Sequence, residues 1–120
     1  MDGDWLSGYG IDYAQGLKHS MGDLAFYKMI LSMFLQDKCF ARGKEACAAG
    51  DYRALFSDMH ELKGVSGNAA LVELHAATVP LVELLRSGDA DKGETERMFA
   101  DVEKAYQRAC EGIALLEAQP

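Results

Sequence analysis

The sequence predicts an all-α fold: an antiparallel, up-down four-helix bundle with an additional short N-terminal helix. Apolar residues recur at spacings of three and four, which is the helical period, and no segment keeps the alternation typical of a strand. Clusters of Gly and Asp divide the chain into pieces of helix length. Long helices joined by short connections pack most simply as antiparallel neighbours.

The first helix is expected over residues 12–19, and Asp23 is placed to cap the next one. The second helix is apolar almost all round, so it has to be covered on more than one face, and the short first helix is the expected cover. One stripe of the second helix holds Leu24, Tyr27, Leu31 and Phe34, and nearly opposite it lie Phe26, Met29 and Met33.

The helical pattern continues to about residue 49, with a break expected near Gly43. Gly50 suits a left-handed helix end, and Asp51 suits the cap of a third helix that runs to about residues 67–69. The fourth helix spans about residues 71–85, and Pro80 inside it predicts a kink or a local break. The last helix is expected over about residues 91–117.

Length and charge limit what the chain can be. Its 120 residues fit a single domain, residues 1–120, with an N-terminal segment over 1–10 and a helical domain over about 11–117. A net charge of -7 argues against binding to nucleic acid or to an anionic membrane surface. No apolar run is long enough for a membrane span and no secretory signal is recognisable, so we expect a cytoplasmic monomer. The three cysteines are odd in number and widely spaced, which predicts neither disulfides nor a metal site.

One stretch, "MHELKGVSGNAAL" at residues 59–71, mixes a histidine, a lysine and two glycines in a way that helix packing does not require. At about 100° per residue, one side of this helix carries Arg53, Phe56, His60, Lys63, Gly64 and Gly67. The opposite, leucine-bearing side belongs to the core. His60 is therefore expected to face solvent, whereas Asp58 lies close to the apolar side and needs a partner at its edge.

An exposed imidazole is substantially neutral near pH 7 and nucleophilic at nitrogen, so it can accept and return a phosphoryl group. Lys63 could lie beside the phosphoryl oxygens and offset their charge. Gly64 lowers helix stability, and a compensation is that its missing side chain lets another protein approach His60. The plainer interpretation is that a single helical histidine is an ordinary surface residue. It applies to His19 and His75, which have no lysine and glycine at matching offsets.

The stretch "HELKGVSGN" resembles the phosphoacceptor motif H-x-x-K-G of histidine-containing phosphotransfer (HPt) domains of bacterial multistep phosphorelays. The likeness extends to "GIDYAQGL", "LAFYKMILSMFL" and "AAGDYRALFSDMHELKG", which together cover most of the chain. The resemblance implies that His60 is phosphorylated and that Lys63 and Gly64 support it. Two positions depart from the family pattern: Ala70 stands where a glycine is common, and near Val82 the family often has a polar residue that assists the histidine.

The sequence thus predicts a phosphocarrier that receives a phosphoryl group from the aspartyl phosphate of a receiver domain and passes it to another receiver. By the resemblance, the partners are response-regulator receivers and a hybrid histidine kinase, and the receiver brings the magnesium ion. We expect no bound cofactor or metal and no kinase activity of its own, because no ATP-binding glycine loop is present. The alternative is a non-catalytic helical module that binds a receiver or a kinase without carrying phosphate. A receiver-docking patch is expected among Phe56, Gly67, Leu17, Phe26 and Met29.

Overall fold

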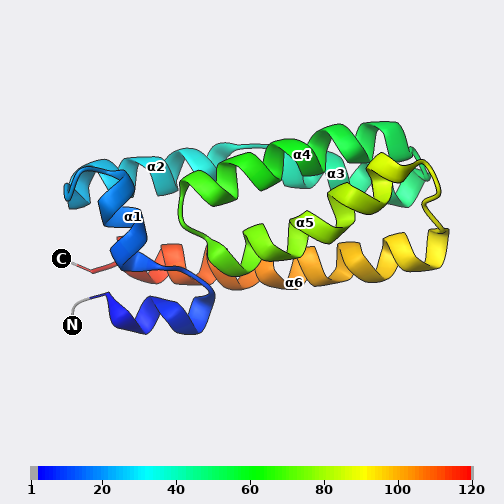
Figure 1. Ribbon diagram of the computed structural model, residues 1–120. Helices are drawn as coiled ribbons and strands as arrows, with labels where there is room; N and C mark the ends of the chain where they lie inside the picture. The colour runs from blue at the N-terminus through cyan, green and yellow to red at the C-terminus, as the bar shows by residue number, and fades with distance from the viewer. Residues whose placement is uncertain (1–2, 120) are drawn as a thin grey trace.

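A computed structural model describes residues 3–119, and within this range the chain is all-helical. The elements follow one another as η1 (Asp4–Tyr9), α1 (Tyr13–His19), α2 (Leu24–Gln36), α3 (Cys39–Ala49), α4 (Tyr52–Asn68), α5 (Val72–Ser87) and α6 (Lys92–Glu117). The molecule is an elongated antiparallel bundle, in which α2 and α3 form the first arm and α4, α5 and α6 the other three (Figure 1). The predicted fold class is confirmed.

Asp residues mark the start of most helices. The side chains of Asp12, Asp23, Asp51 and Asp91 each accept a hydrogen bond from the backbone N–H three residues later, which satisfies one otherwise unpaired donor at the helix start. Gly50 ends α3 in the left-handed conformation, with φ 70°. These local signals are why the predicted helix boundaries agree closely with the observed ones.

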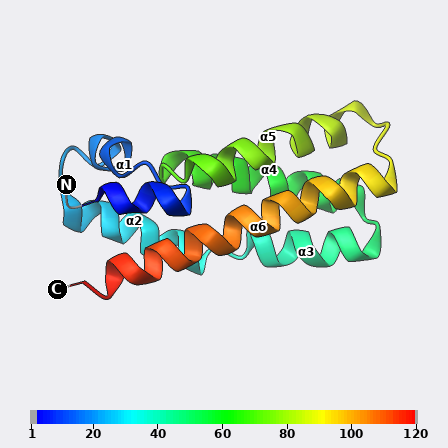
Figure 2. The same ribbon diagram turned by 90° about the horizontal axis from the view of Figure 1, so that it is seen from below.

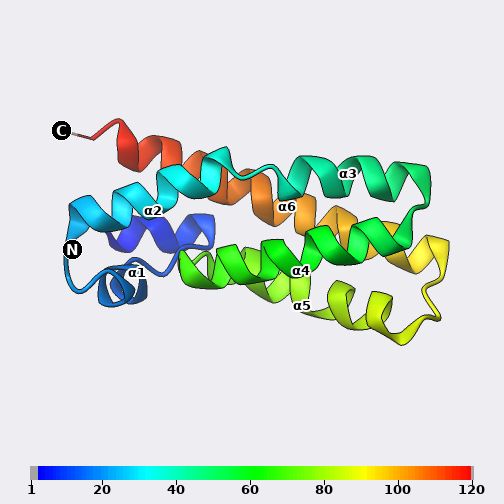
Figure 3. The ribbon, with the colours of Figure 1, turned by 90° about the horizontal axis from the view of Figure 1, so that it is seen from above.

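The break in the first arm falls at Asp37 and Lys38, so the expectation of a break near Gly43 is wrong (Figure 3). The Asp37 carboxylate accepts a hydrogen bond from the Cys39 backbone N–H at 2.8 Å, a local bond that competes with continued helix. Gly43 lies instead inside α3, buried against α4, where a Cβ atom would come within 2.6 Å of Met59 Cε. Its small size serves close helix packing.

Of the two outcomes expected at Pro80, a local break is not observed, because α5 is one continuous helix from Val72 to Ser87, and a kink stays a prediction. Pro80 is exposed, and so is Ala76, whose carbonyl loses its usual partner to the proline ring. Water can therefore hydrogen-bond that carbonyl, which makes a proline tolerable here.

The N-terminal segment expected over residues 1–10 contains a short 3-10 helix, η1, and its first two residues lie outside the described range. The side chain of Leu6 is fully buried, and η1 packs beside α6 (Figure 2). Arg108 of α6 forms an ion pair with Glu73 of α5 at 2.6 Å and donates a hydrogen bond to the carbonyl of Gly8. The segment is thus attached to two arms of the bundle.

None of the helices within residues 3–119 combines the length and the apolar character that a membrane span needs.

Candidate functional site

Helix α4 presents His60 to solvent because its opposite side is committed to the core. Leu55, Met59 and Leu62 are fully buried, and they fix the rotation of the helix. His60 is exposed, as predicted, with Lys63 partly exposed and Gly64 exposed one turn further on. The three residues of the expected phosphoacceptor motif thus lie together on an accessible face.

An open hollow lies on this face. Its lining residues come from α4 and α5, and they are His60, Lys63, Gly64, Gly67, Asn68 and His75. Four of the six belong to the side of α4 that the sequence predicts as functional. Asn68 also lies on α4, one turn after Gly64, and only His75 comes from another helix.

The His60 imidazole lies beside one aromatic ring, that of Phe56. Its ring centroid lies 5.9 Å from that of Phe56, and Arg86 of α5 covers the Phe56 ring with its guanidinium carbon 5.4 Å from the centroid. Within residues 3–119 no hydrogen bond to the His60 ring is formed. Val82 is fully buried and apolar, and Glu83 is exposed and pairs with Arg86 at 3.6 Å. Neither of these two residues orients the imidazole.

Lys63 is available to an anion. In the described part of the chain, no carboxylate lies within ion-pairing distance of its amine, whereas Arg42, Lys44, Arg86 and Arg108 are all paired. Its backbone, by contrast, is well held: the Lys63 carbonyl accepts hydrogen bonds from Ser66 Oγ at 3.1 Å and from His75 Nδ1 at 2.9 Å. The Lys63 amine thus forms no ion pair with the described residues, while its backbone is held by two side-chain hydrogen bonds. This combination suits the binding of a phosphoryl group.

The two glycines of the motif differ in their surroundings. A Cβ atom on Gly64 would meet nothing within 4 Å, so nothing inside the described chain requires a glycine there. A Cβ atom on Gly67 would lie 3.0 Å from His75 Nδ1 and 3.2 Å from His75 Cε1. Gly67 makes room for an imidazole from α5, and Gly64 leaves open space beside His60.

His75 is the site residue that the sequence analysis missed. Because α4 and α5 are antiparallel and joined by a short turn, positions equally far from Leu71 face each other, and Gly67 and His75 are each four residues away. This count could have placed His75 against α4. A comparison of sequence offsets within one helix could not.

Asp58, whose partner the sequence does not reveal, is bound by Arg42 of α3, with Nε and Oδ1 3.2 Å apart. Arg42 also reaches Glu61 at 3.3 Å, so it joins α3 to the residues on either side of His60. This contact fixes α4 against the arm that carries the break.

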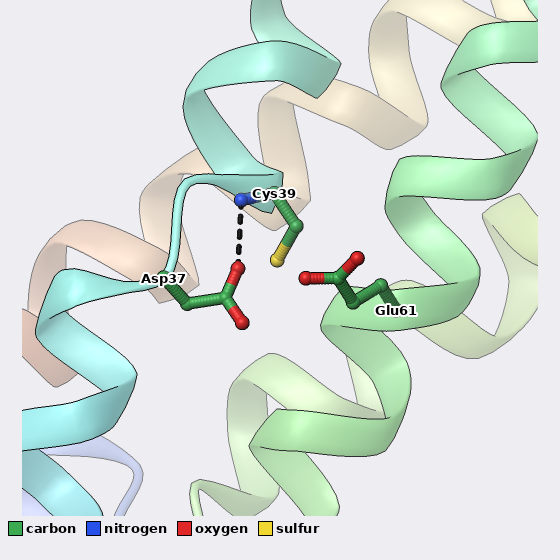
Figure 4. A group of neighbouring side chains, drawn as sticks. All are labelled: Asp37, Cys39 and Glu61. Carbon is green, nitrogen blue, oxygen red and sulfur yellow. Dashed lines mark hydrogen bonds between the residues drawn. The ribbon is translucent and has the colours of Figure 1, made fainter.

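Asp37, Cys39 and Glu61 meet at that break, with possible metal-ligating atoms within 4.8 Å of one another (Figure 4). A hydrogen bond with Asp37 raises the pKa of Glu61. Burial acts to raise the Asp37 pKa, but the bonds from Cys39 and Glu61 outweigh it and hold that pKa below its usual value. Burial, assisted by Asp37, raises the pKa of the Cys39 thiol, which therefore stays protonated. Arg42 also forms an ion pair with Glu61. We therefore interpret the three residues as a hydrogen-bonded group that joins α4 to the start of α3, and we still expect no metal there.

Of the residues predicted for docking, Gly67 lines the hollow, Phe56 lies beside His60, and the other three belong to α1 and α2. Met29 is 51 % exposed and Phe26 39 % exposed on α2, while Leu17 of α1 and Phe56 of α4 are half-buried. A groove between α2 and α4 continues from the hollow, since Asn68 borders both; its other lining residues are Ile30, Met33, Phe34, Asp37 and Val65. The α2 side of the molecule therefore offers apolar surface next to the site.

Comparison with family models gives one match, to the Hpt domain, over residues 29–112. The matched region contains α3, α4 and α5 entirely, together with most of α2 and α6. The chain therefore belongs to the Hpt domain family, whose members are phosphocarrier modules in histidine phosphorelays and interact there with receiver domains and kinases. Comparisons with curated proteins and with solved structures give no significant match.

Proposed function

We propose that this protein carries a phosphoryl group on His60, accepting it from the aspartyl phosphate of one receiver domain and passing it to a second receiver. The observation that carries the proposal is an exposed imidazole one turn from a lysine that forms no ion pair with the described residues, both at the edge of an open hollow. A family match alone does not identify the acceptor, whereas this geometry favours one residue.

In the proposed step a ring nitrogen of His60 attacks the phosphorus of the receiver's acyl phosphate. The nitrogen–phosphorus bond forms as the phosphorus–oxygen bond to the aspartate breaks, and the aspartate leaves as a carboxylate. Transfer to the next receiver is the same step in reverse. No redox change is involved, and the magnesium ion that neutralises the phosphoryl oxygens comes with the receiver.

The chain's own contribution is electrostatic and steric. No carboxylate among residues 3–119 competes for the Lys63 amine, so the amine can approach the phosphoryl oxygens as charge develops on them. The open space at Gly64 admits the receiver's loops to His60. Exposed apolar residues of α2, with Leu17 of α1, then provide the area on which the receiver rests.

The test is replacement of His60 by glutamine, followed by incubation with labelled phospho-receivers from the same genome. We expect the variant to lose phosphoryl acceptance completely while its melting temperature changes little, because the exposed imidazole makes no hydrogen bond that the fold needs. His19→Gln is the matched control and should transfer like the parent. Transfer that persists in His60→Gln would overturn the assignment.

A further inference from the structure

His75 of α5 lines the hollow and packs against the backbone of α4. Its Nδ1 lies 2.9 Å from the carbonyl oxygen of Lys63, and because a carbonyl can only accept, Nδ1 carries the proton. The missing side chain of Gly67 leaves the space that the ring occupies. Two features of the sequence, a histidine on α5 and a glycine on α4, thus serve one contact.

This contact is made with a part of α4 that has a low helix propensity. Gly64 and Gly67 both follow Lys63 within little more than one turn, and each glycine lowers helix stability by about 1 kcal/mol relative to alanine. The Ser66 hydroxyl also bonds back to the Lys63 carbonyl at 3.1 Å, a type of bond that tends to bend helices. A hydrogen bond from the neighbouring helix to the same carbonyl pins this turn to α5.

The position of this turn decides where the Lys63 amine lies relative to His60. Neither side chain is anchored by an ion pair or hydrogen bond to another described residue, so their relative placement depends on the backbone between them. We propose that His75 is a positioning residue for phosphoryl transfer: it holds the turn that carries Lys63, and through Lys63 it keeps positive charge beside the phosphoryl group on His60. This inference rests on the proposed function.

The proposal predicts which kinetic quantity changes. The His75 ring is half-buried against the backbone of α4, so its loss should leave receiver affinity nearly unchanged and slow the transfer rate at saturating receiver. At metal sites, removal of the hydrogen-bonding partner that orients a ligand costs about tenfold or more in affinity or activity, and we expect a loss of that order here. A purely structural role would instead lower the melting temperature and the fraction of active protein, with no change in the rate per active molecule.

The experiment uses the full chain and the phosphorylated receiver that serves the parent protein best. Single-turnover rates are measured against receiver concentration for His75→Ala and for His75→Gln, whose amide N–H can also donate to the Lys63 carbonyl. We expect His75→Ala to lose about tenfold at saturation and His75→Gln to recover most of that loss. Gly67→Ala displaces the ring without removing it, so it should reproduce the His75→Ala defect even if His75→Ala folds poorly.

A double-mutant cycle tests the route through Lys63. If His75 acts by placing Lys63, then adding His75→Ala to Lys63→Ala should cause no further loss of rate. Additive losses, or rates equal to the parent's in both His75→Ala and Gly67→Ala, would overturn the inference while leaving phosphotransfer by His60 intact. Failure of the parent chain to accept phosphate from any receiver would instead overturn the proposed function.

Discussion

Replacing Gly64 should separate the stability of the protein from its activity. Gly64 is exposed in the interior of α4, and a Cβ atom there would meet nothing within 4 Å. Gly64→Ala therefore gains helix propensity without a steric cost, and the expected gain is about 1 kcal/mol in the free energy of unfolding. For a domain of this size that corresponds to a rise of about 4 °C in melting temperature.

Gly64→Gln should gain a similar amount, because glutamine is also a good helix former and its side chain can extend into solvent. The same side chain would occupy the space through which a receiver reaches His60. Misplacement of reacting groups by about 1 Å can cost about 100-fold in rate, so we expect at least that loss in transfer. The variant would then be more stable than the parent and nearly inactive.

The assays are urea unfolding, for the free energy, and transfer from a labelled phospho-receiver, for activity. For the unfolding measurement, Gly67→Ala is the matched control in the same helix, because its Cβ atom would lie 3.0 Å from His75 Nδ1 and the crowding should cancel the gain in propensity. Wild-type transfer by Gly64→Gln would show that the glycine is not there for access. A Gly64→Ala variant no more stable than the parent would refute the energetic reasoning.

The remaining predictions concern the docking surface and the two non-glycine residues in the left-handed conformation. Receiver binding should be weakened, with the fold retained, by each of three substitutions: Leu17→Ala, Phe26→Ala and Met29→Ala. For a residue at the centre of the patch the expected loss in binding free energy is about 2 kcal/mol, which titration calorimetry would detect. Parental affinity in all three variants would place the docking face elsewhere. Met21 has φ 57° and is 88 % exposed. Met21→Gly should therefore relieve about 1–2 kcal/mol of backbone strain, which exceeds the entropy cost of glycine, and the urea midpoint of unfolding should rise. Ala70 has φ 58°, but its methyl group is buried and contributes about 0.8 kcal/mol, so Ala70→Gly loses about as much as it gains and should change the midpoint little. An equal shift in both variants would contradict this account.

The fold could be predicted because its determinants are local. Asp caps and glycine ends set most helix boundaries, and apolar spacing set the rotation of α4 that exposes His60. The predicted position of the break is wrong because glycine is the commoner helix breaker, whereas here the Asp37 carboxylate bonds the Cys39 N–H and Gly43 lies inside α3, packed close to Met59.

The candidate site was predictable only as far as one helix carries it. His60, Lys63 and Gly64 lie on a single face of α4 and follow from helical geometry. The partners that fix this face come from other elements: Arg42 of α3 on Asp58, and His75 of α5 on Lys63. Such contacts depend on the register between helices, which the spacing of residues within one helix does not determine.

The turn between α4 and α5 sets the register between these two helices. Some of the hydrogen bonds that hold this turn come from residues outside the range matched by the family model. Ala70 adopts the left-handed conformation, at a cost of about 1–2 kcal/mol for a residue with a side chain. Its carbonyl accepts a hydrogen bond from the Asp12 N–H at 2.9 Å, and the Glu73 N–H donates to the Gly10 carbonyl at 3.2 Å. Residues 10–12 precede the matched range of 29–112. The N-terminal segment therefore helps to hold the strained turn from which α5 starts, and with it the alignment that sets His75 against the phosphoacceptor helix.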